Sequence, residues 1–210
     1  MEIKRFIFNP IEVNCYVLSD DSKECVVIDA GCWTEREQLQ LCQYIEENEL
    51  KVKHLLNTHL HFDHVYGNLF MKQKFGIETE AHPDDEFMLH ENQLREMGIA
   101  NANMPVAPIG RYLSNGESIL FGRECLDVIH VPGHSPGGVA FHSASAEAVW
   151  VGDTLFCRSM GRTDLVGGNQ DQLVNSIREK LFSLPDSTVV YPGHGPATTI
   201  GEERQFNPYL

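Results

Sequence analysis

The stretch Thr58-His59-Leu60-His61-Phe62-Asp63-His64 decides the fold, because it places four potential metal ligands within six residues. His59 and His61 are two positions apart, so in an extended backbone both side chains point to the same side. Asp63 and His64 follow directly and can diverge toward a second ion. Imidazole and carboxylate groups together suit zinc, iron or manganese. We therefore interpret the stretch as part of a site for two metal ions.

The composition is that of a globular protein with a strong negative charge. A length of 210 residues and an apolar content of 42% predict one domain over residues 1–210 with a sizeable core. There are 30 acidic and 16 basic residues, and the formal net charge is -14. Nucleic acids and anionic membranes require a basic face on the protein. The charge therefore argues against both as partners and is attributed to solubility.

The N-terminus and the cysteines predict a cytoplasmic protein. The first residues contain no signal-peptide core, and no run of about 18 apolar residues predicts a membrane-spanning helix. The six cysteines include no C-x-x-C pair. In a reducing cytosol we expect free thiols and core residues rather than disulfides. A cysteine nucleophile is the weaker alternative.

Hydrophobic patterns predict strands and helices in both halves of the chain. The expected strands are residues 3–8, 13–18, 25–29, 52–57, 77–81, 118–121, 126–131, 138–141, 148–151 and 187–191. The expected helices are residues 35–47, 65–75, 83–91 and 170–182. Each half has strands followed by a helix, which favours an α/β fold of two sheets packed face to face with helices outside.

Capping signals and residue spacing predict where individual helices begin and end and which faces are buried. Thr34 and Glu37 predict a capping box at the start of the first helix, and Leu39 is expected on the apolar face of that helix. The helix over residues 65–75 is expected to end at Gly76. Residues 92–114 show no clean period and predict a long loop or a loose helix over the surface, either functional or merely a variable connection.

Three later segments repeat one pattern, in which an apolar strand and a tight Gly or Pro turn are combined with a ligand-type side chain. These side chains are His134, Asp153 and His194. Glycine lets the backbone turn tightly and approach closely. Taken singly each residue is ordinary at a turn, but their joint occurrence with the opening stretch favours a metal site. The other five histidines lack such neighbours and are expected to be structural or surface residues: His54, His82, His90, His130 and His142.

Seven potential ligands divide into two sets and one bridge. The expected sets are His59, His61 and His134 for one ion, Asp63, His64 and His194 for the other, and Asp153 between them. Two cations about 3.5–4 Å apart lower the pKa of a shared water toward about 7. A bridging hydroxide is then the expected nucleophile, with the substrate carbonyl polarised by the same ions. Two divalent ions are expected, zinc first, with iron or manganese as alternatives.

These motifs resemble the metallo-β-lactamase superfamily in their order and in their approximate spacing. The resemblance runs across almost the whole chain, from Asn14-Cys15-Tyr16 and Asp29-Ala30-Gly31 to the Pro-Gly-His turn at His194. It implies the metallo-β-lactamase fold, an αββα sandwich of two mixed sheets. It also implies a dinuclear site at one edge of those sheets.

Within the superfamily, the chain is similar to the hydroxyacylglutathione hydrolase (glyoxalase II) branch. The similar segments are Pro132–Gly137, Gly152–Phe156 and Gly161–Asp164. The resemblance implies hydrolysis of a small thioester such as S-lactoylglutathione or a related acyl-thiol. A thiol of pKa about 8.5 leaves without a strong general acid. Asp63 is the expected catalytic residue, because it would orient the hydroxide, and Arg162 is expected to bind substrate at the pocket rim or to form a structural ion pair.

One departure from this branch leaves the thiol open. Full-length members carry a helical C-terminal domain that helps to bind glutathione, whereas only residues 195–210 follow His194. We therefore expect no separate glutathione-binding domain. Two alternatives to thioester hydrolysis are kept: a persulfide dioxygenase with a single iron, and a non-catalytic metal-binding module.

Overall fold

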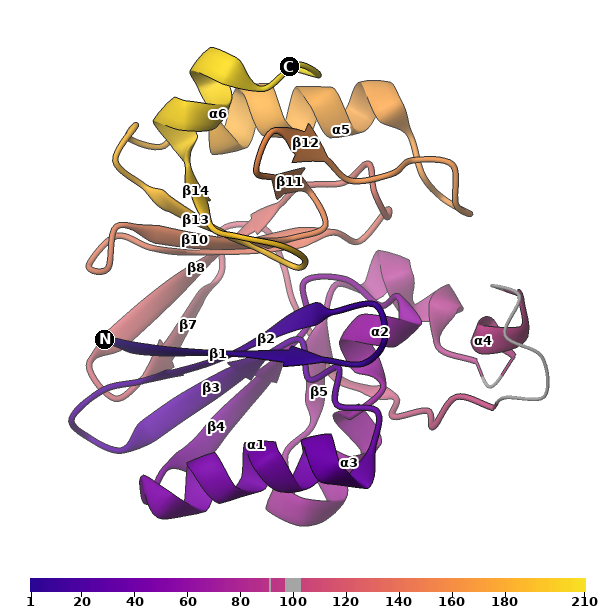
Figure 1. Cartoon of the computed structure of the whole chain (residues 1–210), viewed down its shortest axis with the longest axis vertical. Coiled ribbons are helices and arrows are strands. Elements are labelled where there is room, and N and C mark those ends of the chain that lie inside the picture. The colour runs from indigo at the N-terminus through magenta and orange to yellow at the C-terminus, as the bar shows by residue number, and fades with distance from the viewer. Residues whose placement is uncertain (91, 97–102) are drawn as a thin grey trace.

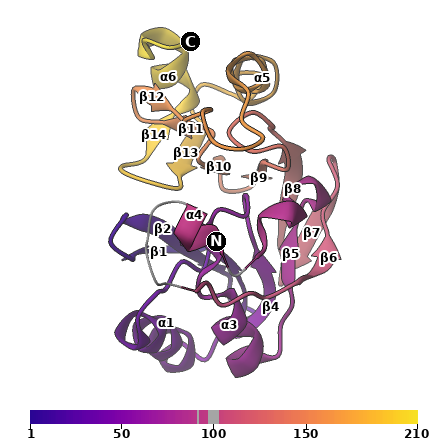
Figure 2. The same ribbon diagram turned by 90° about the vertical axis from the view of Figure 1, so that its right-hand side faces the viewer.

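The computed structural model describes residues 1–90, 92–96 and 103–210. Two six-stranded sheets pack face to face, and helices cover their outer faces (Figure 1). Turned by 90°, the same layers are seen with α1 and α3 on one side and α5 and α6 on the other (Figure 2). The predicted αββα sandwich is confirmed.

The first sheet has the strand order β1-β2-β3-β4-β5-β6. Its strands are Glu2–Phe8 (β1), Val13–Ser19 (β2), Glu24–Ile28 (β3), Lys51–Leu56 (β4), Thr79–Ala81 (β5) and Ile109–Tyr112 (β6). Pairing is antiparallel from β1 to β3 and parallel from β3 to β6, so the sheet is mixed. Helices α1 (Glu35–Glu47) and α3 (Asn68–Phe75) cover its outer face (Figure 1).

The second sheet has the order β14-β13-β10-β9-β8-β7 and is also mixed, because β10 and β13 run parallel. Its strands are Ser118–Phe121 (β7), Glu124–His130 (β8), Val139–Ser143 (β9), Ala148–Gly152 (β10), Val189–Pro192 (β13) and Thr198–Thr199 (β14). A small hairpin of Leu155–Phe156 (β11) and Ser159–Met160 (β12) follows β10. Helix α5 (Gln170–Ser176) continues as a π-helical turn, Ile177–Leu181, and α6 is Ile200–Phe206.

Successive side chains of the central strands point to opposite faces of each sheet, and this alternation creates three apolar layers. In β2, Tyr16 and Leu18 point between the sheets, whereas Cys15 and Val17 point toward α1 and α3. In β10, Trp150 points between the sheets and Val149 toward α5. Strands buried on both faces need near-continuous apolar sequence, which explains why these segments are apolar throughout.

The predicted helix over residues 65–75 is wrong at its start. Helix α2 is Phe62–Val65, and α3 begins only at Asn68. Between them, the Gly67 N–H donates to Ala30 O at 2.8 Å. A side chain at Gly67 would collide with Cys32 Sγ and Ala30 O, so the close approach of this turn to the segment after β3 interrupts the helix.

Helix α1 confirms the predicted capping box. The Glu37 N–H donates to Thr34 Oγ1, and the Glu37 carboxylate accepts from the Thr34 N–H. The placement of Leu39 on the buried face is wrong, because its side chain is 56% exposed. Leu41 lies about 200° around the helix from Leu39, and the buried stripe follows Leu41 and Ile45 instead.

The segment 92–114 contains a short helix, which the alternative of a loose helix allowed, and a strand that was not predicted. It contains α4 (Gln93–Glu96) and the strand β6, which pairs in parallel with β5. Residues 97–102 lie outside the described residues, and so does Glu91, the expected end of the helix predicted from residue 83. The structure has a 3₁₀ helix, Pro83–Met88, at that place.

In the part of the chain that the structure describes, we find no helix with both the length and the apolar character required to span a bilayer.

Candidate metal centre

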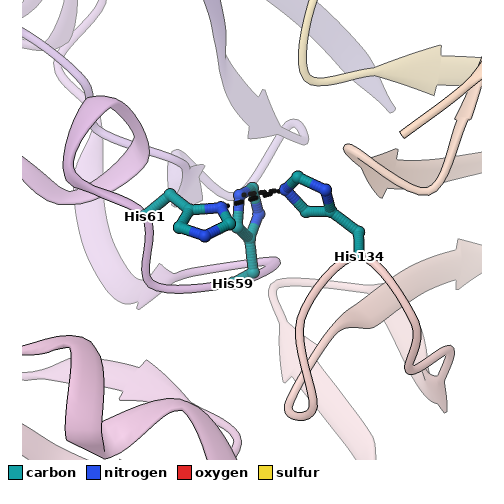
Figure 3. Close-up of side chains that lie close together, drawn as sticks. All are labelled: His59, His61 and His134. Atoms are coloured by element: carbon teal, nitrogen blue, oxygen red, sulfur yellow. Dashed lines mark hydrogen bonds between the residues drawn. The ribbon is translucent and has the colours of Figure 1, made fainter. Parts of the chain in front are cut away.

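Three histidines converge from two loops that belong to different sheets (Figure 3). His59 and His61 follow β4, and His134 follows β8. His134 Nε2 lies 2.9 Å from His61 Nδ1 and 3.3 Å from His59 Nε2, and all three side chains are buried. Nitrogen ligands about 2.0–2.1 Å from a tetrahedral ion stand about 3.3 Å apart. The group therefore has the spacing of a metal-binding set.

A second group is formed by Asp63, His64 and His194. Asp63 and His64 lie in α2, and His194 follows β13. Asp63 Oδ2 lies 3.1 Å from His194 Nε2 and 3.5 Å from His64 Nε2. One carboxylate oxygen and two imidazole nitrogens therefore lie within 4.8 Å of one another, a donor set that again suits a divalent ion.

Asp153 lies between the two groups, in the turn after β10. Its Oδ2 is 3.7 Å from His134 Nε2 and 3.6 Å from His194 Nε2, while its Oδ1 is 3.4 Å from His64 Nε2. The carboxylate thus contacts members of both groups, as a bridging ligand must. The structure brings all seven predicted residues together, and their role as ligands stays a prediction.

Two buried atoms of this cluster favour a bound cation. Within the described residues, His64 Nε2 and Asp153 Oδ1 face each other at 3.4 Å without a hydrogen bond between them, and neither has another hydrogen-bond partner. Leaving buried polar atoms without a partner is costly, about 1–3 kcal/mol each. A divalent ion would satisfy both, so the donor set fits the predicted metals.

The imidazoles of the cluster differ in protonation, because, although burial opposes them, the neighbouring carboxylates raise the pKa of His64 and of His194. Burial and the neighbouring imidazoles lower the pKa of His59 well below its usual range, and burial lowers the pKa of His61 to about 4. Both rings are therefore neutral at pH 7 and keep a lone pair. Although burial opposes it, neighbouring imidazoles lower the pKa of Asp153, which keeps this carboxylate ionised.

Asp29 is a functional residue that the sequence reasoning missed. Its carboxylate accepts from His64 Nδ1 at 2.9 Å, from Thr58 Oγ1 at 2.7 Å and from the Thr58 N–H at 2.8 Å. It therefore orients His64 so that Nε2 faces the centre. The signal was partly present, because Asp29 directly follows the apolar strand β3 and a glycine stands two residues after it, whereas at the three later strand ends the glycine directly precedes the ligand-type residue.

Replacing Asp29 with asparagine is expected to weaken metal binding by about 10–100-fold while the chain still folds. Asparagine tolerates the left-handed backbone at this position, where φ is 54°, but its single oxygen cannot accept all three hydrogen bonds. Metal affinity measured by competition with a chelator checks this. Asp127→Asn, at an exposed carboxylate on β8, is the matched control, and equal affinities in the two variants would contradict the role of Asp29.

A second buried carboxylate joins the two loops that carry the histidines. Asp85 accepts from Ser135 Oγ at 2.8 Å and from the Gly137 N–H at 2.6 Å, both in the loop of His134. It also accepts from the backbone of Leu60, between His59 and His61. Burial raises the pKa of Asp85 above its usual range. Through Asp85, the 3₁₀ helix Pro83–Met88 therefore fixes the loop of His59 and His61 relative to the loop of His134.

Arg162 lies at the rim of the cavity above the centre. Its guanidinium donates to both oxygens of Asp164, at 2.7 and 2.8 Å, in an exposed ion pair. Its backbone carbonyl accepts from His134 Nδ1 at 2.7 Å, which fixes the direction of Nε2. The backbone of Arg162 thus contributes to the site, and substrate binding by its side chain stays a prediction.

Two of the remaining histidines, His82 and His130, contact each other, which the sequence does not indicate. The rings of His82 and His130 stack with their centroids 4.3 Å apart and an interplanar angle of 5°, and Asp84 lies beside His82. In this second cluster of ligand-type side chains, the stacked rings join the residue that follows β5 to the last residue of β8.

The six cysteines are free, as predicted, and four of them are buried. Burial raises the pKa of Cys25 and Cys32 to about 12. The thiolate is the nucleophilic form, so these two residues are poor nucleophiles. They act as core residues beneath α1.

The chain is similar to known proteins along nearly its whole length. The profile described as "Metallo-beta-lactamase superfamily" matches residues 9–194. The chain is 36% identical over 211 residues to the "Probable metallo-hydrolase YqgX" of Bacillus subtilis, covering 100% of this chain and 98% of the relative. It is 35% identical over 213 residues to the "Hydroxyacylglutathione hydrolase GloC" of Haemophilus influenzae, with the same coverage.

A relative with a different named activity also matches. The mouse "Persulfide dioxygenase ETHE1, mitochondrial" is 32% identical over 200 residues, covering 93% of this chain and 70% of that protein. The same family therefore contains relatives of this chain named for hydrolysis and for oxidation.

Solved structures agree with the fold. The BLEG-1 B3 metallo-β-lactamase superposes with a TM-score of 0.91 at 34% identity, covering 100% of this chain and 99% of that one. The di-iron-bound form of TTHA1623 superposes with a TM-score of 0.85 at 36% identity, covering 99% and 100%. Together with the family profile, these similarities establish that the chain belongs to the metallo-β-lactamase superfamily.

Proposed function

We propose that this chain is a dinuclear metal-dependent hydrolase of small thioesters, similar in activity to glyoxalase II. The observation that carries the proposal is the pair of ligand groups joined by Asp153, with orphaned buried atoms on Asp153 and His64. The relative named hydroxyacylglutathione hydrolase supports the choice of a thioester. Zinc is the proposed metal, and iron is the alternative because a similar solved structure is di-iron-bound.

The proposed roles follow from the side chains in place. His59, His61 and His134 would hold one ion, and Asp63, His64 and His194 would hold the second. Such ions, when bound, supply an activated water and polarise a carbonyl group. The Asp63 carboxylate, ionised because its pKa is lowered despite burial, is suited to orient the attacking water and to accept its proton. Asp29 and the Arg162 carbonyl hold His64 and His134 in the orientations that this requires.

Metal content and thioester turnover together test the proposal. The metal-loaded chain is expected to contain two divalent ions per chain and to hydrolyse acetyl-N-acetylcysteamine or S-lactoylglutathione. Removal of metal with a chelator should abolish turnover, and added Zn²⁺ should restore it. Two bound ions with no turnover of any thioester would contradict the proposed reaction.

The persulfide dioxygenase is the second candidate, favoured by the similarity to the mouse relative of that name. It predicts a single iron and oxygen consumption with glutathione persulfide. The second group, in which Asp63 Oδ2 and His194 Nε2 are 3.1 Å apart, favours two ions instead. One iron per chain together with oxygen uptake would select the dioxygenase.

A further inference from the structure

The metal centre opens into a cavity with largely apolar walls. This cavity has a volume of about 480 Å³, and its apolar walls come from Ile11, Phe62, Phe156, Met160 and Leu165. A larger cavity of about 610 Å³ lies near the N-terminus and contains none of the seven predicted ligands. Small-molecule sites are concave and mostly apolar, with few polar groups, so the cavity above the centre is the one that suits a substrate.

A smaller cavity, which we call the annex, continues past His61. It has a volume of about 170 Å³ and is lined by His61, Phe87, Met88, His90, Gln93, Leu165 and Val166. His61 and Leu165 line both cavities, so the annex adjoins the metal centre. Phe87 is 50% exposed and Val166 is 79% exposed. Exposed apolar side chains grouped at one opening mark ligand-binding surfaces.

The size of the annex sets the size of the group that it can hold. An apolar cavity of about 150 Å³ binds a benzene-sized molecule. The annex therefore accommodates roughly six carbons. A lactoyl group, which is shorter and carries a hydroxyl, would leave most of it unfilled.

Apart from the metal ions proposed for the centre, the described residues that line the two cavities offer no unpaired cation for a substrate carboxylate. Among the described residues that line them, Arg162 is the one lysine or arginine, and Asp164 neutralises its guanidinium. Residues 91 and 97–102 contain no lysine or arginine in sequence. Glutathione carries two carboxylates, and the net charge of the chain is -14. Recognition of a doubly carboxylated thiol is therefore electrostatically disfavoured at this rim.

We propose that the centre acts on thioesters with an apolar acyl group of about six carbons and a thiol without carboxylates, the acyl group lying in the annex. This inference rests on the proposed thioesterase function. Hydrolysis joins the oxygen of water to the acyl carbon and breaks the C–S bond, yielding a carboxylic acid and a thiol. The apolar walls beyond His61 select the acyl group by burial.

The substrate class is tested with the metal-loaded chain and four thioesters. We expect kcat/KM for N-acetylcysteamine thioesters to rise on the order of a hundredfold from acetyl through butanoyl to hexanoyl. The kcat/KM for S-lactoylglutathione should be lower than that for the hexanoyl compound. No dependence on chain length, or a preference for S-lactoylglutathione, would overturn the inference and leave the thioesterase proposal standing. Absence of turnover with all four compounds would overturn both.

Two variants locate the selectivity. Val166→Asp places a charge at the annex and should lower the hexanoyl-to-acetyl ratio of kcat/KM about tenfold, whereas Leu39→Asp, at an exposed leucine of α1, should keep the wild-type ratio. Asp164→Asn frees the Arg162 guanidinium and should lower KM for S-lactoylglutathione several-fold relative to the neutral compounds, with a gain that shrinks in high salt. An unchanged ratio in Val166→Asp would show that the annex does not hold the acyl group.

Discussion

Asp63→Ala is expected to lower kcat/KM for a thioester by a factor on the order of 10³ or more. The substitution removes the carboxylate oxygen that lies 3.1 Å from His194 Nε2 and 3.5 Å from His64 Nε2. It therefore removes one predicted ligand and the group that would orient the attacking water. Metal content is expected to fall from two ions to one per chain. Metal quantification and steady-state kinetics on the same preparation check both effects.

His142→Ala is the matched control for this variant. His142 lies on β9 opposite Asp127, outside the metal centre, and its side chain is only partly buried. Removing it should leave two ions bound. Loss of one metal from the His142 variant, or near-normal turnover in the Asp63 variant, would show that the ligands have been assigned wrongly.

Gly193→Ala is expected to disrupt the metal centre, because Gly193 directly follows strand β13 of the second sheet and packs against two of the predicted ligands. A Cβ atom there would collide with Asp153 Oδ1 and would lie 2.7 Å from His64 Cε1. The bridging carboxylate and one imidazole must then move, and a misplacement of about 1 Å costs on the order of 100-fold in rate. We expect at least one metal equivalent to be lost and kcat/KM to fall by about 100-fold or more. Crowding in the core also costs about 1–3 kcal/mol of unfolding free energy.

Gly76→Ala separates this steric effect from a general cost of replacing glycine. Gly76 ends α3 as predicted, with φ at 69° and open space around the position of a Cβ atom. Alanine there must adopt a left-handed backbone, which should cost about 1–2 kcal/mol in unfolding free energy and leave both metals in place. Circular dichroism confirms that each variant is folded before metal is counted. Full metal content in Gly193→Ala would contradict the close packing of Asp153 and His64 against this turn.

Much of the fold was predictable because the sheets are buried on both faces. Apolar runs such as those of β2 and β10 stand out in the sequence, since both of their faces pack against neighbouring layers. Strand β6 was missed for the opposite reason. Three of its four residues, including Arg111 and Tyr112, are exposed, so it carries no apolar pattern and exists because it pairs with β5. The break between α2 and α3 depends likewise on a distant contact, that of Gly67 with Ala30.

The sequence by itself determined the chemistry of the centre: which side chains can bind metal, and that each follows a strand. Strand ends on one edge converge in this class of fold, so seven residues could be grouped without coordinates. Only the tertiary structure decided the contacts between the sheets. It aligned His61 and His134 at 2.9 Å, and it brought Asp29 against His64 at 2.9 Å. Such contacts depend on how the two sheets and their loops pack against each other. The spacing of residues along one strand carries no information about the distance between two loops.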